Sequence, residues 1–163
     1  MTDDDLLREF LSYDPGTGVF RWIKTRSSRI MVGDVAGSYN ADGYWQINFG
    51  KKLYLGHRLA VFLMTGRWPE HTVDHRDRNK SNNRWENLRE ASYSQNSANM
   101  VRRPNNTSGR KGVFFGRNSK RPFAQIMVNR KSIHLGTFDT VEEASAAYET
   151  AATKYFGEFA RSA

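Results

Sequence analysis

The chain has 163 residues with 38% hydrophobic and 13% aromatic content, enough for one ordinary domain or two small ones, and not typical of a disordered protein. Lys and Arg outnumber Asp and Glu by 25 to 17, so the net charge of +8 favours a polyanionic partner such as nucleic acid. Cysteine is absent, which excludes disulfides, thiolate zinc sites and cysteine nucleophiles.

The sequence does not point to a membrane. Residues 1–5 are acidic and contain no apolar leader, and no stretch approaches the length that crosses a bilayer. We therefore expect a protein of the cytoplasm with no membrane partner.

The first part of the chain predicts a helix followed by short strands. Apolar residues recur at helical spacing over 5–12 after an acidic start. Residues 13–18 have the composition of a turn, and 19–23 alternate as a strand does. Residues 44–49 and 53–55, separated by a Gly-Lys-Lys turn, predict a β-hairpin. A small antiparallel sheet is expected.

From His57 the apolar spacing becomes helical, and residues 66–69 end the predicted helix. The following segment predicts a strand, a polar loop, a second apolar patch and a helix, over 71–75, 76–82, 85–88 and 92–100. Asp74 and His75 are neighbours, so in a strand their side chains point to opposite faces. The strand should therefore stop at one of these two residues.

The last third of the chain predicts a separate unit. Residues 102–110 are polar, basic and rich in breakers, as in an interdomain linker. Three strands and one amphipathic helix then follow, over 113–115, 123–129, 132–135 and 140–155. A turn at 129–131 is expected to join the second and third of these strands. The predicted fold class is α+β, ending in a three-stranded antiparallel sheet packed on one helix.

Asp74, His75 and Asn96 could together cut a phosphodiester. A hard divalent cation needs oxygen ligands, which a carboxylate and a carboxamide supply, and an imidazole can take a proton from water. The alternative is structural, because a lone Asp-His pair is more often a surface feature and clustered asparagines usually mean loops.

The motif in residues 73–100 is more specific than any of its parts. Asp74-His75, then Asn83-x-x-x-Asn87-Leu, then Ser-Gln-Asn96, resembles the HNH endonucleases in residue type, order and spacing, particularly the homing-endonuclease branch common in phage genomes. The resemblance covers about a sixth of the chain and extends weakly back to His57. It implies a ββα-metal motif over about 71–100.

The resemblance also implies roles for individual residues. His75 would be the general base, Asp74 and Asn96 the ligands of one divalent ion, and Asn87 a brace of the motif. Many members have a third histidine where this chain has Asn96, and an amide oxygen shifts metal choice towards Mg²⁺ or Mn²⁺. Asn83 should brace a loop without touching the metal.

His57 is expected to pack or cap a helix, whereas Arg58 is a candidate phosphate contact. His71 and His134 are expected to be structural, and Trp85 to lie in the core beneath the loop.

Residues 108–160 resemble the ethylene-response-factor type of DNA-binding domain, which is known fused to HNH nucleases. The residues that carry the resemblance are Lys111-Gly-Val113, Ala124-Gln-Ile126, Ile133 to Thr140, Glu142-Glu-Ala144, Ala147-Tyr148, Ala151-Ala152 and Phe156-Gly157. The resemblance implies a sheet that enters the major groove. Three arginines and a tryptophan of the plant pattern are missing, at Phe114, Gly116, Met127 and His134, so a plant-like target sequence is not expected.

Basic and amide side chains in strands and turns remain as candidate DNA contacts. With Arg58, they are Arg110, Arg117, Arg121, Gln125, Asn129 and Arg130. Lys120 and Lys131 fit an ordinary solvated role equally well.

The sequence therefore predicts a metal-dependent DNA endonuclease or nickase that acts on double-stranded DNA as a monomer or weak dimer. The predicted divisions are a nuclease domain over 1–101, a linker over 102–110 and a DNA-binding domain over 111–163. If the gene belongs to a phage, the host cytoplasm is the expected location. The alternatives are a DNA-binding regulator with a non-catalytic HNH remnant and a protein that binds or cuts RNA.

Overall fold

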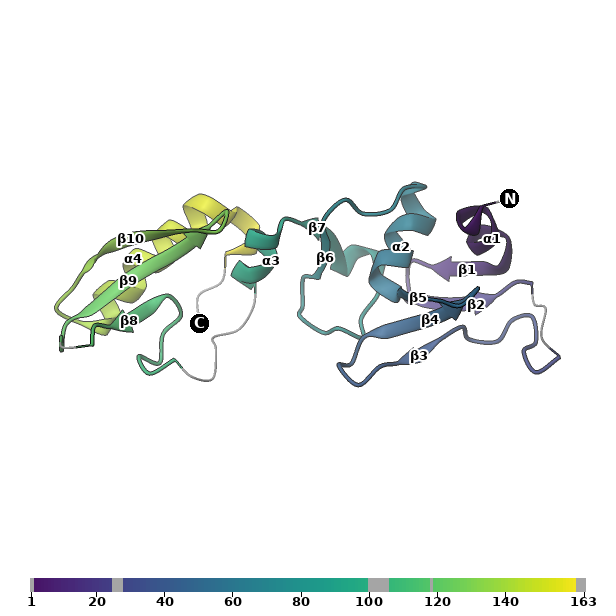
Figure 1. The fold of residues 1–163 in the computed structure, drawn as a ribbon, viewed down its shortest axis with the longest axis horizontal. Helices are drawn as coiled ribbons and strands as arrows, with labels where there is room; N and C mark the ends of the chain where they lie inside the picture. Colours follow the sequence, from purple (N-terminus) through teal and green to yellow (C-terminus); the bar gives the residue numbers. More distant parts are fainter. Residues whose placement is uncertain (1, 25–27, 100–105, 118, 161–163) are drawn as a thin grey trace. The chain divides into compact units, whose positions relative to one another are not determined.

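The structure is a computed structural model that describes residues 2–24, 28–99, 106–117 and 119–160. The chain forms two compact units, Met1–Glu90 and Ala91–Ala163. Small antiparallel sheets and helices alternate in both (Figure 1), so the predicted α+β class is confirmed.

The first unit begins with α1 (Asp3–Phe10), followed by β1 (Leu11–Asp14) and β2 (Val19–Trp22), which pair antiparallel. The helix predicted over 5–12 is therefore wrong at both ends. It starts earlier because Thr2 and Asp5 form a capping box. It ends earlier because Leu11 takes an extended conformation, pairs with Trp22 and is buried, so strand pairing overrides the helical spacing of Leu11.

A three-stranded sheet and a helix follow. β3 (Ser38–Tyr39), β4 (Trp45–Phe49) and β5 (Lys52–Leu55) lie in the order β3-β4-β5, which confirms the predicted hairpin. The chain then enters α2 (Gly56–Thr65), which ends at Gly66 in the left-handed conformation, as predicted from the sequence.

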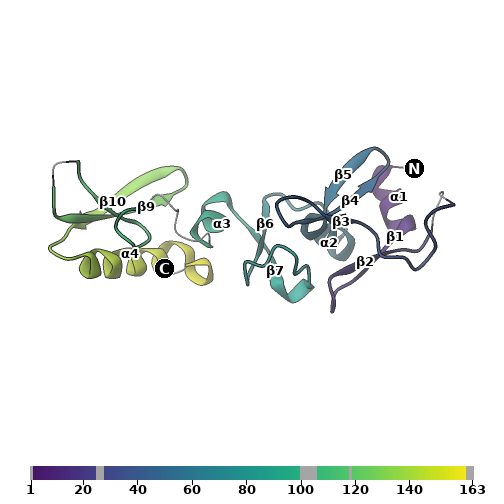
Figure 2. The same cartoon turned by 90° about the horizontal axis from the view of Figure 1, so that it is seen from below.

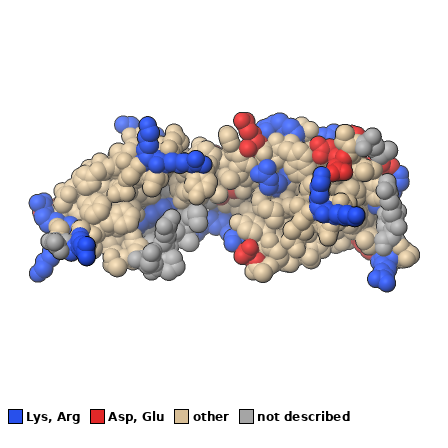
Figure 3. Space-filling model, in the orientation of Figure 1, with Lys and Arg blue, Asp and Glu red and all other residues tan. Residues whose placement is uncertain are grey.

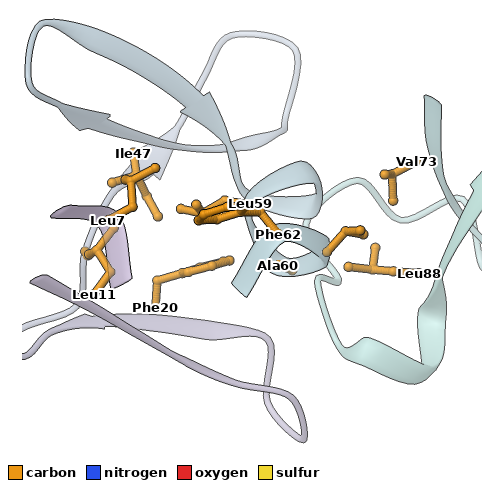
Figure 4. Packing of buried hydrophobic residues seen from close by; sticks show 11 residues of the cluster. Leu7, Leu11, Phe20, Ile47, Leu59, Ala60, Phe62, Val73 and Leu88 are labelled. Atoms are coloured by element: carbon orange, nitrogen blue, oxygen red, sulfur yellow. The ribbon is translucent and has the colours of Figure 1, made fainter. Parts of the chain in front are cut away.

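Helix α2 is the centre of the hydrophobic core of this unit. In Figure 4, Leu59 and Phe62 face the N-terminal elements, where Leu7, Phe20 and Ile47 are buried. Val73 and Leu88 lie on another side of the same helix (Figure 4) and belong to the same core cluster. The helix therefore anchors the segment around Asp74 and His75 to the rest of the unit.

The predicted motif has the expected order of elements. It comprises β6 (Thr72–His75), a short 3₁₀ helix η1 (Trp85–Asn87), β7 (Leu88–Ala91) and α3 (Tyr93–Asn99), and β6 pairs with β7. The strand ends at His75, as predicted. Trp85 packs against the core of the first unit, as also predicted.

The second unit contains β8 (Val113–Phe115), β9 (Pro122–Val128), β10 (Lys131–Thr137), α4 (Val141–Phe156) and η2 (Gly157–Phe159). The sheet has the order β10-β9-β8, and Figure 2 shows α4 along one of its faces. Small residues of the helix, Ala144, Ala151 and Ala152, pack with Val113 and Ile126 in one cluster. The predicted three-stranded sheet on one helix is confirmed.

The division between the units falls within β7, so α3 is grouped with the second unit. The predicted linker, 102–110, lies partly outside the described residues, and the functional assignment of the two domains stays a prediction. Among the residues that the structure describes, no helix has the length and apolar character needed to cross a membrane.

Gly18 allows the β1–β2 turn to approach the loop that follows β6. Its φ is +76°, and a Cβ atom there would lie 2.6 Å from the carbonyl carbon of Asn83. The Tyr13 hydroxyl donates a 2.7 Å hydrogen bond to the Asn83 carbonyl oxygen beside it. The turn therefore fixes the loop through backbone contact.

We predict that Gly18→Ala lowers the free energy of unfolding by more than about 1 kcal/mol, because it combines a left-handed backbone with a backbone clash. Gly43→Ala is the matched control, since Gly43 has φ +83° but nothing within 4 Å of the added Cβ. Urea unfolding followed by tryptophan fluorescence measures both, because all four tryptophans lie in the first unit. Equal losses in the two variants would contradict this account.

Candidate active site

Asp74 and His75 are adjacent on β6 and are both buried, with 6% and 5% of their surfaces exposed. Their side chains contact different residues: Asp74 contacts Arg89, and His75 contacts Asn83. These separate partners agree with the opposite orientations expected of neighbouring strand residues. The end of β6 thus carries a buried carboxylate and a buried imidazole, each held by its own partner.

Asp74 forms a buried ion pair with Arg89 on the neighbouring strand β7. The Nε and Nη2 atoms of Arg89 lie 3.0 and 2.9 Å from Oδ2 of Asp74, and both side chains are almost fully buried. Removing either charge from such a pair leaves the other buried without compensation. Arg89 therefore balances the charge of the Asp74 carboxylate and holds it in a fixed orientation.

The His75 ring is held by Asn83 of the loop. Nε2 of His75 lies 3.2 Å from Oδ1 of Asn83, so the neutral tautomer that donates this hydrogen bond carries its lone pair on Nδ1. Burial lowers the pKa of His75 below its ordinary value, although the Asn83 hydrogen bond opposes this effect. The imidazole is therefore neutral at pH 7, as a proton acceptor must be.

Asn87 closes the loop between β6 and β7 through its carboxamide. Its Oδ1 accepts a 3.0 Å hydrogen bond from the Asp77 backbone N–H, and its Nδ2 donates to Asp77 Oδ1 and to the Asn82 carbonyl, at 2.9 and 2.8 Å. The Asn87 carbonyl also accepts from the Arg76 N–H. The side chain bonds to the loop at three points and is 7% exposed, the geometry of a structural brace.

Asp77 is a further member of this network that sequence reasoning missed. Partial burial raises the pKa of its carboxyl, but hydrogen bonds from Asn82, Asn79 and Asn87 outweigh burial and bring the pKa below its ordinary value. The sequence did contain a signal for this role. Asp77 follows His75 by two residues in a loop rich in asparagine, and a carboxylate in such a loop accepts hydrogen bonds from nearby backbone and amide N–H groups.

A second imidazole lies beside His75. The ring centroids of His57 and His75 are 5.1 Å apart with an interplanar angle of 72°, and Tyr44 lies 5.3 Å from His57. His57 is buried, and its Nδ1 has no hydrogen-bond partner among the residues that the structure describes. The ring thus packs against the candidate base, in keeping with the packing role expected for it.

Arg58, the next residue of α2, is engaged within the first unit. Its guanidinium donates to the carbonyl oxygens of His71 and Pro69, at 2.7 and 3.0 Å. These bonds tie α2 to the segment that leads into β6. A phosphate contact by Arg58 stays a prediction, and it would have to use the remaining guanidinium hydrogens.

Asn96 lies on α3, in the second unit, and is half-buried. The helix begins with reciprocal bonds: the Ser92 N–H donates to Gln95 Oε1, and the Gln95 N–H donates to Ser92 Oγ. A metal ion shared by Asp74 and Asn96 stays a prediction. Within the described ranges, no group of three or more His, Asp or Glu side chains could hold a metal.

The candidate DNA contacts of the second unit lie in its turns and on its sheet. Arg110 and Arg117 flank β8, and Arg121 precedes β9 and lies 2.7 Å from Asp139. Asn129 and Arg130 form the predicted β9–β10 turn, with φ values of 49° and 64°. Ser94 Oγ accepts a hydrogen bond from the Asn129 N–H, which ties this turn to α3. Gln125 is half-buried in the middle of β9.

The segment that contains the candidate site matches a known protein family. Residues 54–98 match the model of a protein family described as HNH endonuclease. The matched range contains α2, β6, η1, β7 and almost all of α3, and with them Asp74, His75 and Asn96. No curated protein matches the chain. The match supports a nuclease activity on DNA in general.

We predict that His57 makes the first unit less stable in acid. The His57 pKa falls to about 3 in the folded chain, through burial and then the nearby charges of His75 and Arg58; Tyr44 also packs against the ring. In the unfolded chain, the ring binds a proton near the ordinary histidine pKa of 6.5. Above pH 6.5 the His57 ring is neutral in both the folded and the unfolded chain and does not lower the free energy of unfolding. As the pH falls from 6.5 towards 3, the ring lowers this free energy by up to about 1.4 kcal/mol per pH unit.

Urea unfolding of the wild type and of His57→Gln, followed by tryptophan fluorescence between about pH 7 and pH 5, tests this prediction. The variant lacks the titrating ring and should lose less stability on acidification. The buried His75 remains in both proteins, so a difference between their pH slopes reports the removal of the His57 ring. Identical pH dependence in the two proteins would show that His57 is not the source.

Proposed function

We propose that the chain is a metal-dependent DNA endonuclease or nickase that hydrolyses phosphodiester bonds with one imidazole base. The observation that supports this best is the pair at the end of β6. A neutral, buried His75 lies next to the Asp74 carboxylate, and each is oriented by its own partner, Asn83 or Arg89. A surface Asp-His pair would have neither the burial nor the partners.

His75 performs the proton transfer in this mechanism. A water molecule loses a proton to the imidazole and forms a bond to phosphorus as the bond to the 3′ oxygen breaks. Nδ1 is the accepting atom when the proton on Nε2 is donated to Asn83. Asn87 acts indirectly, because it holds the loop that carries Asn83.

Asp74 and Asn96 are the residues that would hold Mg²⁺ or Mn²⁺. Both offer hard oxygen donors, and the remaining coordination positions suit water and phosphate. When bound, the ion would supply positive charge to the phosphate and the leaving oxygen. Arg89 supports this arrangement by fixing the orientation of the Asp74 carboxylate.

The second unit is proposed to deliver the nuclease to double-stranded DNA. It has 11 Lys and Arg residues against five Asp and Glu, and no acidic residue occurs between Ala91 and Phe138. Four of these acidic residues lie in α4 or η2, and Asp139 precedes α4 and forms an ion pair with Arg121. The uncovered face therefore combines with the basic turns to form a surface suited to a polyanion.

We predict that His75→Ala reduces cleavage of supercoiled plasmid by about 10²- to 10⁴-fold while DNA affinity is unchanged, because the proton acceptor is lost and the proposed DNA contacts are kept. The assay compares nicked and linear products over time with Mg²⁺, Mn²⁺ or chelator. His71→Ala is the control, since His71 is an exposed histidine of the same segment. Unimpaired cutting by His75→Ala would refute the mechanism, and binding without cutting by the wild type would favour the DNA-binding regulator.

We predict that replacing Arg117 and Arg130 together by Ala weakens DNA binding and lowers the slope of log K against log salt by up to about 2, since each phosphate contact contributes about 0.9. Both arginines lie in exposed turns, so folding should be unaffected. Lys154→Ala removes a charge from α4, on the other side of the sheet, and serves as the control. Equal salt slopes for all three proteins would exclude the proposed surface.

A further inference from the structure

The sheet of the second unit has one covered face and one free face. Along β9, Pro122, Ala124 and Ile126 are buried against the α4 side, whereas Phe123, Gln125 and Met127 alternate with them and point away. In Figure 3 the surface over this sheet is mostly tan, with Lys and Arg side chains at its margins. The free face is thus largely uncharged and bordered by positive charge.

An aromatic row crosses this face. Phe114 of β8 pairs with Phe123 of β9, with ring centroids 5.7 Å apart, and Phe123 lies 5.6 Å from the ring of His134 on β10. Phe114 is 41% exposed and Met127 is 56% exposed, so apolar surface remains in contact with water. Rings at this spacing already touch one another and leave no room for a base to insert between them.

The positive charge of the second unit indicates which kind of molecule binds this face. The segment from Ala91 to Phe138 has nine basic residues and no acidic one. Arg117 and Arg130 lie in turns next to the sheet, where they can reach phosphates on either side of a groove. A duplex whose backbone meets the turns would bring its base edges to the uncharged centre of the face.

The side chains at the centre of the free face have the chemistry that recognises A·T base pairs. Apolar groups such as phenylalanine contact the C5 methyl group of thymine in the major groove, and glutamine bonds in a bidentate manner to N6 and N7 of adenine. Guanine is most often read by arginine, and the outward positions of the three described strands include Phe114, Phe123, Gln125, Met127, Ser132 and His134, but no arginine.

We infer that the free face of the β8–β10 sheet selects A·T base pairs by contact with thymine methyl groups, with Gln125 positioned to bond adenine. This inference rests on the proposed function of the second unit as a reader of duplex DNA. Phe114 and Met127 provide the methyl contacts at the exposed edges of the face, and Phe123 supports them from its centre.

The test uses the full chain in chelator, to prevent cutting, and two pools of short duplexes with a randomised interior. One pool contains thymine and the other contains uracil, which differs only by the C5 methyl group. The uracil pool should bind more weakly, by about fourfold for each methyl group that the face buries. Sequences recovered from the thymine pool should be enriched in A·T pairs.

Phe114→Ala and Met127→Ala should each reduce the difference between the two pools. Both residues are exposed, so these variants are expected to fold. Tyr155→Ala is the matched control, because Tyr155 is 41% exposed like Phe114 but lies on α4. It should preserve the full difference.

The possible failures can be told apart. Equal binding of the thymine and uracil pools, or recovery of G·C-rich sequences, would overturn the thymine inference while leaving DNA binding intact. Tighter binding of single-stranded pools would also overturn it. Absence of binding to every pool would instead refute the proposed DNA-binding function.

Discussion

The candidate site depends on the hydrogen bonds that Asn87 makes across the loop between β6 and β7. A carboxamide has both donors and an acceptor, so one side chain can bond an N–H, a carboxylate and a carbonyl of the same loop. Without these bonds, the polar loop has little apolar surface to hold it in one conformation. The loop in turn carries Asn83, and Asn83 contacts the candidate base. A residue that braces the loop thus determines how the base is presented.

Hydrophobic packing of α2 also holds the site in place. Helix α2 contributes Leu59 and Phe62 to the core on one side and is tied by Arg58 to the backbone before β6. The same helix brings His57 against His75, so a single element joins the hydrophobic core to the imidazole pair. Because closely packed cores resist small displacements, the position of His75 is set by the whole first unit and not by the motif alone.

Sequence reasoning succeeded where the determinants are local. The end of β6 at His75, the β9–β10 turn at Asn129 and Arg130, and the apolar face of α4 all follow from patterns within a few residues. It failed where tertiary pairing decides, as at Leu11, which joins a strand because Trp22 is available as a partner. The partner of Asp74 depends on how β7 pairs with β6, and the approach of His57 to His75 depends on helix packing. Neither can be derived from spacing in a single sequence.

The ion pair between Asp74 and Arg89 has a consequence for how the protein responds to scarce divalent ions. Small domains that use a metal to balance buried charge unfold when the metal is removed. In this chain the Arg89 guanidinium already balances the charge of the buried Asp74 carboxylate. This carboxylate is therefore not left without a counter-charge when no cation is bound. Under the proposed function, loss of the ion would then stop cleavage while the chain stays folded, and cleavage would return when the ion is restored.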